Sequence, residues 1–271
     1  MRIELNDVSF SYPNGFLAVD NINLTINSGE KVAIVGQNGA GKSTTARMLN
    51  GLQRPSEGTI MIGDMNTKDY TTAQLSRMVG YVFQNPDDQI FHSKVIDEVQ
   101  YGLKKMNLSE EEIERRVNYS LEITGMEEYA EENPYNLPLS LRKFVTIASI
   151  IAMDCPIMIF DEPTAGQDMS GNITLENIIN ELHSRKKTII IITHDMEFVV
   201  KNFEKVIVMA NKRVIKVDET REVFWDLPVL REANLHQPYI SKLCHDLNIG
   251  GKILTIEEAI NELYKSELEE G

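Results

Sequence analysis

Gly36-Gln37-Asn38-Gly39-Ala40-Gly41-Lys42-Ser43 matches the phosphate-loop pattern G-x-x-x-x-G-K-[ST] at every fixed position. The apolar, β-branched stretch 31–35 before it predicts a buried strand, and apolar residues at helical spacing over 43–52 predict a helix. In that setting the backbone N–H groups of the loop and the positive end of the helix converge on phosphate oxygens. Lys42 can then reach the outer phosphates, and the Ser43 hydroxyl can ligate Mg²⁺. An ordinary glycine-rich turn is the competing interpretation, and the two flanking elements argue against it.

The composition narrows the class of protein. A chain of 271 residues with 42% apolar and 25% charged residues has room for one large α/β domain and a small appendage. Its net charge of −14, with no long basic cluster to offset it, argues against a nucleic-acid partner. Cys155 and Cys244 lie far apart without a C-x-x-C pattern, which favours a reducing cytosol over a disulfide framework.

Membrane association, if any, is expected to come through a partner. The first residues carry no apolar stretch typical of a secretory signal. The longest apolar run, over about 144–160, is interrupted by Asp154 and Pro156 and is too short to span a bilayer.

Strands and helices alternate along the rest of the chain. Alternating apolar residues over 2–27 predict strands joined by turns, and 58–62 predicts a further strand. Residues from about 85 to 155 read as a helical insertion, and a hairpin over 206–217 precedes a helical tail over 222–271. The pattern favours an α/β domain interrupted by helices.

Two capping boxes mark expected helix starts. Ser109-x-x-Glu112 opens an amphipathic helix that Gly125 closes, and Thr255-x-x-Glu258 opens a helix in the tail. In each box the hydroxyl and the carboxylate are expected to cap the backbone reciprocally.

Polar residues follow three predicted buried strands. The apolar run 156–160 ends at Asp161 and Glu162, the run 188–192 delivers His194, and the strand 79–83 ends at Gln84. Because α/β sheets place ligands at the carboxyl ends of their strands, we expect these side chains beside the phosphate loop. A carboxylate pair at a strand end can also be a solvated turn, and a lone histidine there is more often structural. Tyr12 lies on a loop ahead of the phosphate loop.

At these residues the chain resembles the ATP-binding cassette (ABC) ATPases, over about residues 1–225. Four further motifs carry the resemblance beside the phosphate loop: Gln84 is similar to the Q-loop glutamine, 157–162 to Walker B, 165–168 to the D-loop and His194 to the switch histidine. Gln167 replaces a residue that is usually apolar in the D-loop. The resemblance implies an α/β fold with a P-loop NTPase core (a mixed sheet with flanking helices), an antiparallel β subdomain, a helical signature subdomain over about 85–155, and a small helical domain over 226–271.

The resemblance also implies a role for each candidate residue. Glu162 is expected to be the general base that polarises the attacking water, and His194 to bridge the γ-phosphate and that base. Tyr12 is expected to stack on the adenine. Mg²⁺ is expected on Ser43, Gln84 and Asp161. The residues expected to bind ATP are Tyr12, Gly36, Gln37, Asn38, Gly39, Ala40, Gly41, Lys42, Ser43, Thr44 and Gln84.

Within the ABC family, two stretches point to one subfamily. Residues 82–91 look like the F-Q-N-P-D-x-Q region of energy-coupling-factor (ECF) and cobalt-type importers. The tail with Gln237-Pro238 and residues 255–258 is similar to the small C-terminal domain through which two such ATPase chains contact each other. This implies an ATPase at the cytoplasmic face of the membrane that energises uptake of a vitamin or a transition-metal ion. Its partners would be a membrane scaffold and a separate substrate-binding membrane component.

One stretch departs from the family. Where the signature L-S-G-G-Q is expected, the chain reads Leu137-Pro138-Leu139-Ser140-Leu141. Pro138 lacks an N–H, and Leu139 adds bulk where backbone must approach phosphate. We therefore expect a defective signature and a second ATPase chain with an intact one, paired as a heterodimer.

Two alternatives remain at this point. One is a soluble cassette in DNA repair or translation, and the other is a regulatory cassette that binds ATP without efficient turnover. The acidic charge and the lack of a coiled-coil insertion disfavour the first, and intact Glu162 and His194 disfavour the second. The loop 85–91 is expected to expose Ile90 and Phe91 and to help form a groove for a helix of the membrane scaffold.

Overall fold

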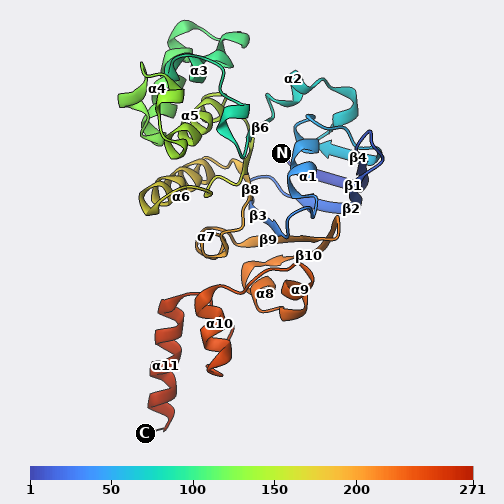
Figure 1. Cartoon of the computed structure of the whole chain (residues 1–271), viewed down its shortest axis with the longest axis vertical. Coiled ribbons are helices and arrows are strands. Elements are labelled where there is room, and N and C mark those ends of the chain that lie inside the picture. The colour runs from blue at the N-terminus through green and yellow to red at the C-terminus, as the bar shows by residue number, and fades with distance from the viewer. Residues whose placement is uncertain (271) are drawn as a thin grey trace.

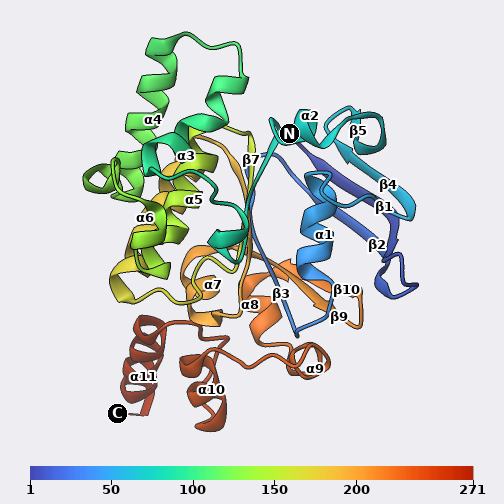
Figure 2. The ribbon, with the colours of Figure 1, turned by 45° about the horizontal axis from the view of Figure 1, so that its top comes forward.

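The computed structural model describes residues 1–270, and Gly271, the last residue of the expected C-terminal domain, lies outside them. Within that range the chain forms a six-stranded sheet in the order β10-β9-β3-β8-β7-β6 and a four-stranded sheet in the order β2-β1-β4-β5. Helices cover the six-stranded sheet, and a separate helical pair extends from its lower end (Figures 1 and 2). The expected α/β architecture with a mixed sheet is confirmed.

The six-stranded sheet forms the centre of the molecule. Strands β6, β7, β8, β3 and β9 run parallel, and β10 pairs antiparallel with β9. β7 and β8 are buried along their whole length, as the continuous apolar runs predict for parallel strands covered on both faces. The bounds are β3 (Lys31–Gly36), β6 (Val79–Val82), β7 (Ile157–Asp161), β8 (Thr188–Ile192), β9 (Lys205–Ala210) and β10 (Arg213–Glu219).

The four-stranded antiparallel sheet packs with α1 (Lys42–Leu49) and one face of the central sheet in a shared apolar core. Gly58 shows how closely its strands approach. It has a φ of 77°, and a Cβ there would lie 2.3 Å from the carbonyl oxygen of Asp7. The bounds are β1 (Ile3–Ser11), β2 (Leu17–Ile26), β4 (Glu57–Ile62) and β5 (Met65–Asn66).

The helical insertion lies between β6 and β7, as expected. Its helices are α3 (Val95–Tyr101), α4 (Glu110–Thr124) and α5 (Leu139–Ala152), and the short α2 (Thr72–Leu75) precedes β6. Ser109 Oγ accepts from the backbone N–H of Glu112, and Gly125 ends α4 with a φ of 68°. The reciprocal half of the capping box is absent, because the Glu112 carboxylate binds Arg115 and Arg116 instead.

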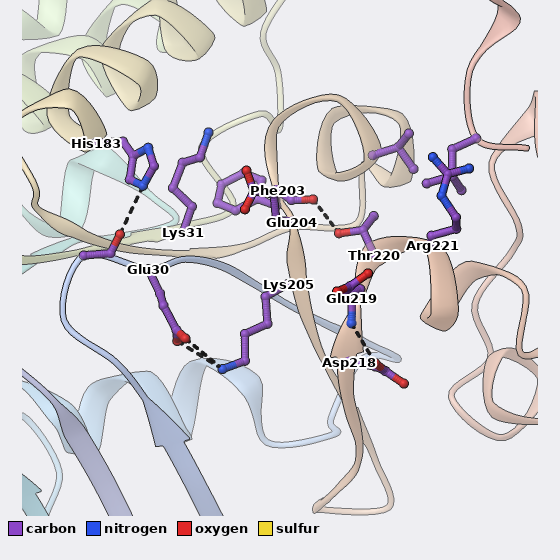
Figure 3. A pocket seen from close by; sticks show the side chains of 13 residues that line it. Glu30, Lys31, His183, Phe203, Glu204, Lys205, Asp218, Glu219, Thr220 and Arg221 are labelled. Atoms are coloured by element: carbon purple, nitrogen blue, oxygen red, sulfur yellow. Dashed lines mark hydrogen bonds and ion pairs between the residues drawn. The ribbon is translucent and has the colours of Figure 1, made fainter. Parts of the chain in front are cut away.

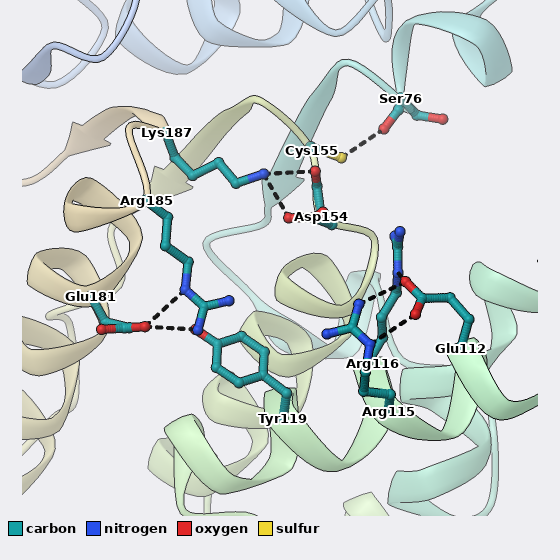
Figure 4. A network of polar contacts seen from close by, with 10 residues as sticks. All are labelled: Ser76, Glu112, Arg115, Arg116, Tyr119, Asp154, Cys155, Glu181, Arg185 and Lys187. Carbon is teal, nitrogen blue, oxygen red and sulfur yellow. Dashed lines mark hydrogen bonds and ion pairs between the residues drawn. The ribbon is translucent and has the colours of Figure 1, made fainter.

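A polar joint connects the insertion to the central sheet (Figure 4). Tyr119 of α4 donates its hydroxyl to Glu181 of α6 (Met169–Ser184) across 3.3 Å. The Arg185 guanidinium lies 4.0 Å from the Tyr119 ring centroid and donates to the same carboxylate across 2.8 Å. Lys187 donates to the Asp154 carboxylate just before β7. These contacts fix α4 against α6 beside the apolar packing.

The C-terminal segment has a small core of its own, formed by Cys244, Ile253 and Ala259 with Trp225 against them. Arg221 pairs with Glu258 at 2.5 Å and so joins α8 to α11. Thr255 Oγ1 accepts from the Glu258 N–H, and the Glu258 carboxylate accepts from the backbone N–H groups of Leu254 and Thr255, as the second capping box predicts. The bounds are α7 (Met196–Asn202), α8 (Thr220–Phe224), α9 (Leu227–Glu232), α10 (Tyr239–Asp246) and α11 (Ile256–Glu270).

A cavity of about 780 Å³ lies between the central sheet and this segment (Figure 3). Within this cavity the Glu30 carboxylate and the Lys205 ammonium form an ion pair at 3.0 Å. His183 Nε2 lies 3.1 Å from the Gly29 carbonyl oxygen. The cavity is at the end of the sheet where β3 begins, so it lies away from the phosphate loop that follows Gly36. Among the described residues, no helix combines the length and the apolar character needed to cross a membrane.

Candidate active site

The phosphate loop connects β3 to α1, as the sequence predicts. Two positions of the loop require glycine, because the backbone of a neighbouring strand lies too close for a side chain. A Cβ on Gly36 would lie 2.0 Å from the Met209 carbonyl oxygen, and one on Gly41 would lie 2.7 Å from that of Ala18. Both glycines also have positive φ, which side chains rarely adopt. The loop is therefore held against β9 and β2 in one conformation.

Lys42 lies inside this loop. It is only 7% exposed, and its ammonium donates to the carbonyl oxygens of Gly36 at 2.7 Å and Gln37 at 3.0 Å. Burial lowers the pKa of Lys42, and the neighbouring Glu162 and Asp161 carboxylates act in the opposite direction. The ammonium is thus oriented at the centre of the site.

Asp161, the last residue of β7, has both carboxylate oxygens fixed. Ser43 Oγ donates to Oδ1 across 3.0 Å, and the Tyr81 hydroxyl of β6 donates to Oδ2 across 2.6 Å. Burial is the main reason that the pKa of Tyr81 is raised, so this hydroxyl stays a donor. Oxygen atoms from two different elements thus lie side by side, and such a donor set fits Mg²⁺.

Glu162 follows directly and has an unusual backbone, with a φ of 51°. Its carboxylate lies 3.0 Å from His194 Nε2, which comes from the loop after β8. Burial raises the pKa of Glu162 to about 7, although Lys42 lowers it. Burial and the Lys42 charge lower the pKa of His194. A carboxyl group whose pKa lies near neutrality can accept and release a proton under physiological conditions.

These residues surround a cavity of about 170 Å³, and every residue of its lining belongs to the predicted site. The lining consists of Asn38, Gly39, Gly41, Lys42, Ser43, Thr44, Gln84, Glu162 and His194. The other predicted residues adjoin it: Gly36 and Gln37 bind Lys42, Asp161 binds Ser43, Tyr12 contacts Thr44, and Ala40 is fully buried in the loop. The structure therefore brings the predicted site together, while the roles of its residues stay predictions.

A family model described as "ABC transporter" matches residues 19–165, just over half of the chain. The chain belongs to the ABC transporter family. It is 39% identical to a putative ABC transporter ATP-binding protein of Pyrococcus furiosus over 95% of this chain and 98% of that protein. It is also 39% identical to the energy-coupling factor transporter ATP-binding protein EcfA of Methanothermobacter thermautotrophicus, over 96% of this chain and 86% of that protein.

A solved structure in the same family has a similar fold. The structure of cbiO1 from Clostridium perfringens, described as part of the ABC transporter complex cbiONQ, superposes with a TM-score of 0.76 at 35% identity. It covers 91% of this chain, and this chain covers 98% of it. The expectation of an ECF-type ABC ATPase is therefore confirmed at the level of the family and its relatives.

Tyr12, which the sequence predicts to stack on adenine, lies between two other aromatic rings. Its ring contacts Phe10 edge-on at 5.0 Å and is inclined by 30° to the ring of the exposed Phe16 at 6.4 Å. Its hydroxyl is 3.3 Å from Thr44 Oγ1, which lowers the pKa of Tyr12. The aromatic rings thus adjoin the start of α1, and stacking on adenine stays a prediction.

The loop after Gln84 differs in one respect from expectation. Phe91 is 61% exposed, but Ile90 is only 3% exposed, so the expected exposure of Ile90 was wrong. Ile90 packs into the main apolar core, which includes α3 and α5 residues. Phe91 instead contacts the rings of His92 and Tyr101 at 4.4 and 4.9 Å. We call Phe91, His92 and Tyr101 the aromatic platform.

The signature segment begins α5, with Pro138 at the N-cap and Leu139 47% exposed in the first turn. Two side chains that the sequence did not single out for this site connect that helix to the segment after β7. One extends from the helix, and the other extends to it. Lys143 is buried and binds the backbone of Glu162, and Gln167 donates to the Ser140 carbonyl at 3.1 Å. A lysine on the apolar face of a predicted helix is unusual, and this could have indicated that Lys143 has buried partners. Tyr81, which binds Asp161, carries no such signal.

Proposed function

We propose that this chain is the ATP-binding and ATP-hydrolysing subunit of an ECF-type ABC importer that energises uptake of a vitamin or a transition-metal ion. The observation that carries the proposal is the convergence of Lys42, Ser43 and Glu162 on one cavity at the carboxyl ends of β3 and β7, with Asp161 behind it accepting a hydrogen bond from Ser43. Relatives named EcfA, which match nearly the whole chain, support the importer class.

ATP binding follows from the loop geometry. The N–H groups of the loop and the N-terminus of α1 favour the phosphates, with Lys42 as the cation nearest to them. Tyr12 would supply the ring face for adenine. Ser43 and Asp161 would hold Mg²⁺, with Gln84 at the rim of the cavity as a further ligand. The ion would supply charge neutralisation when bound.

Hydrolysis joins the oxygen of a water molecule to the γ-phosphorus and breaks that phosphorus's bond to the bridging oxygen. Glu162 accepts the proton that the water loses, for which its raised pKa is suitable. His194 orients the Glu162 carboxylate across 3.0 Å and is placed to contact the γ-phosphate. The chain otherwise acts by positioning and by charge, as phosphoryl transfer requires.

Exposed apolar surfaces support the two kinds of partner. The aromatic platform combines Phe91 and His92, from the loop that follows Gln84, with Tyr101 at the end of α3, and it is proposed to contact a helix of the membrane scaffold. The C-terminal helices are proposed to contact the second ATPase chain, because each carries exposed apolar residues at helical spacing. They are Tyr239 and Leu243 on α10, Leu247 at its C-cap, and Ile256, Ile260 and Tyr264 on α11.

The second ATPase chain is proposed to carry an intact L-S-G-G-Q. In a head-to-tail pair, each ATP lies between one chain's phosphate loop and the other chain's signature. The segment Pro138–Ser140 would therefore weaken only the site that holds the partner's ATP. The loss of one oriented donor at such a site costs roughly 3 kcal/mol of barrier.

Affinity isolation of the tagged full-length chain from detergent-solubilised membranes tests this proposal. The expected result is co-isolation of a second cassette ATPase with an intact signature and of polytopic membrane proteins, with phosphate release from ATP by the assembly. Recovery with ribosomes or DNA instead, and none from membranes, would contradict it.

A further inference from the structure

A buried lysine joins the signature helix to the catalytic strand. Lys143 lies in the second turn of α5 and is only 4% exposed. Its ammonium donates to the carbonyl oxygen of Glu162 at 2.7 Å and to that of Ala165 at 2.6 Å. Both oxygens belong to the turn that follows β7 and carries the candidate base.

This turn needs external support. Glu162 has a φ of 51°, a left-handed backbone conformation that a residue with a side chain adopts only at a cost in free energy. Within the turn, Ala165 N donates to the Glu162 carbonyl at 3.3 Å, and Glu162 N donates to Ile192 O at 2.8 Å. Lys143 adds a third contact that spans both ends of the turn. The direction of the Glu162 side chain depends on this backbone.

An apolar residue would be easier to bury at position 143. The flanking residues of α5 on the same face, including Phe144 and Ile147, belong to the main apolar core. Burial of an ammonium group is costly unless its hydrogen bonds are satisfied, and burial lowers the pKa of Lys143. Because a lysine is a poor choice for packing alone, its two carbonyl contacts are the better explanation for it.

A second contact joins the same two segments. Gln167 donates through Nε2 to the carbonyl oxygen of Ser140 in the first turn of α5, at 3.1 Å. Gly171 leaves the space that this side chain occupies, because a Cβ there would lie 2.3 Å from Gln167 Oε1. A residue that departs from the family pattern at the D-loop is thus in contact with one of those that depart from it at the signature.

We propose that Lys143 is a positioning residue for hydrolysis, which directs the Glu162 carboxylate into the cavity by holding the carbonyl oxygens of Glu162 and Ala165. The proposal rests on the proposed function, since it takes Glu162 as the base. Because α5 begins at the signature segment, the same side chain links that segment to the base of its own chain.

The test measures steady-state phosphate release by the assembly isolated through the tagged chain. Lys143→Met should lower kcat by about 10²-fold, the effect of a misplaced catalytic group, while the KM for ATP changes less than about threefold. Lys143→Arg keeps the charge and the donors and should recover most of kcat. Lys187→Met is the matched control, because Lys187 is also largely buried and donates to a main-chain carbonyl, that of Asp154, away from the site.

Wild-type kcat in Lys143→Met would overturn the proposal, and so would an Arg variant as slow as the Met variant, since volume rather than donation would then matter. If Lys143→Met does not assemble, Lys143→Gln takes its place. The neutral amide of glutamine is easier to bury than an ammonium but too short to reach both carbonyl oxygens, so kcat should again fall. A wild-type kcat in Lys143→Gln would count against the proposal. Glu162→Gln distinguishes failure of the proposed function from failure of this inference. If Glu162→Gln leaves phosphate release intact, the proposed function fails. If Glu162→Gln lowers kcat but Lys143→Met does not, only the role of Lys143 is excluded.

Discussion

His194 Nε2 lies 3.0 Å from Glu162 Oε1, although the two residues come from different strands. β7 and β8 are neighbours in the central sheet, and each delivers its polar residue at the same edge. Glu162 is buried and His194 is 47% exposed, so the histidine lies on the solvent side of the carboxylate. The contact identifies the side of Glu162 from which a water or a phosphate can approach.

His194→Ala should therefore impair turnover more than binding. The carboxylate loses its orienting partner but keeps its burial, and kcat should fall by about 10²-fold with KM for ATP nearly unchanged. Phosphate release at saturating ATP measures kcat, and its dependence on ATP concentration gives KM. A proportional rise of KM with an unchanged kcat would show that His194 serves in binding instead.

Tyr81→Phe tests the support of Asp161. The change removes the Tyr81 hydroxyl that donates to Asp161 Oδ2 at 2.6 Å, and it leaves a buried carboxylate oxygen without that donor. The free energy of unfolding should fall by about 1–3 kcal/mol. Thermal unfolding of the full chain measures the loss, with Tyr264→Phe on the exposed face of α11 as a control. Equal midpoints in the two variants would contradict the account.

Phe91→Asp tests the aromatic platform. Phe91 is 61% exposed and is not part of the main apolar core, so the chain should fold and bind ATP as before. A charge in the platform should weaken the contact with the membrane scaffold, and solute uptake should fall by about tenfold or more, the effect of losing a central aromatic anchor. Uptake in cells and ATP binding by the isolated chain are the two measurements. Unchanged uptake would exclude the platform as the docking surface.

The joint between α8 and α11 predicts an acid-sensitive C-terminal segment. The hydrogen bonds from Arg221 lower the pKa of Glu258 from 4.5 to about 2. A lowered pKa in the folded chain stabilises it above pH 4.5, and this contribution is lost as the pH falls from 4.5 towards 2. Arg221→Met should remove that dependence.

The fluorescence of Trp225 can follow this transition, because Trp225 is the one tryptophan of the chain and packs against the small C-terminal core. The control is Lys265→Met, since Lys265 pairs with Glu262 on the same helix and does not join α11 to α8. Identical fluorescence titrations of Arg221→Met and the unmodified chain between about pH 6 and pH 2 would contradict the assignment.

The sequence predicted the parts of the structure that local pattern determines. The run 188–192 has no polar side chain except the first, so a buried parallel strand was the simplest outcome, and the phosphate loop needs its strand and helix. The prediction that Ile90 is exposed was wrong, because the chain after Gln84 turns back and packs Ile90 against the helices of the insertion. Lys143 was not found because its partners are carbonyl oxygens far along the chain, and a pattern of side chains does not show which main-chain atoms they meet.

The capping box at Ser109 formed only in part, for a related reason. Ser109 and Glu112 have the spacing of a capping box, but two arginines lie one turn further along the same helix. The Glu112 carboxylate binds them instead, because a charged partner forms the stronger hydrogen bond. The domain boundary at 225/226 stays a prediction: it falls between α8 and α9, next to Trp225, whose indole N–H binds the Ile253 carbonyl at 3.0 Å.

The central claim is that this chain supplies the base of the one efficient site in an asymmetric pair of ATPases. The most direct measurement is phosphate release by the assembled transporter after a glutamate-to-glutamine change in one chain at a time. Glu162→Gln keeps shape and ATP binding but removes the proton acceptor, so hydrolysis should fall by about 10²-fold or more. The equivalent change in the partner chain should do much less, because that chain's site faces the Pro138–Ser140 segment. Equal losses from the two changes, or near-normal release by Glu162→Gln, would contradict the account.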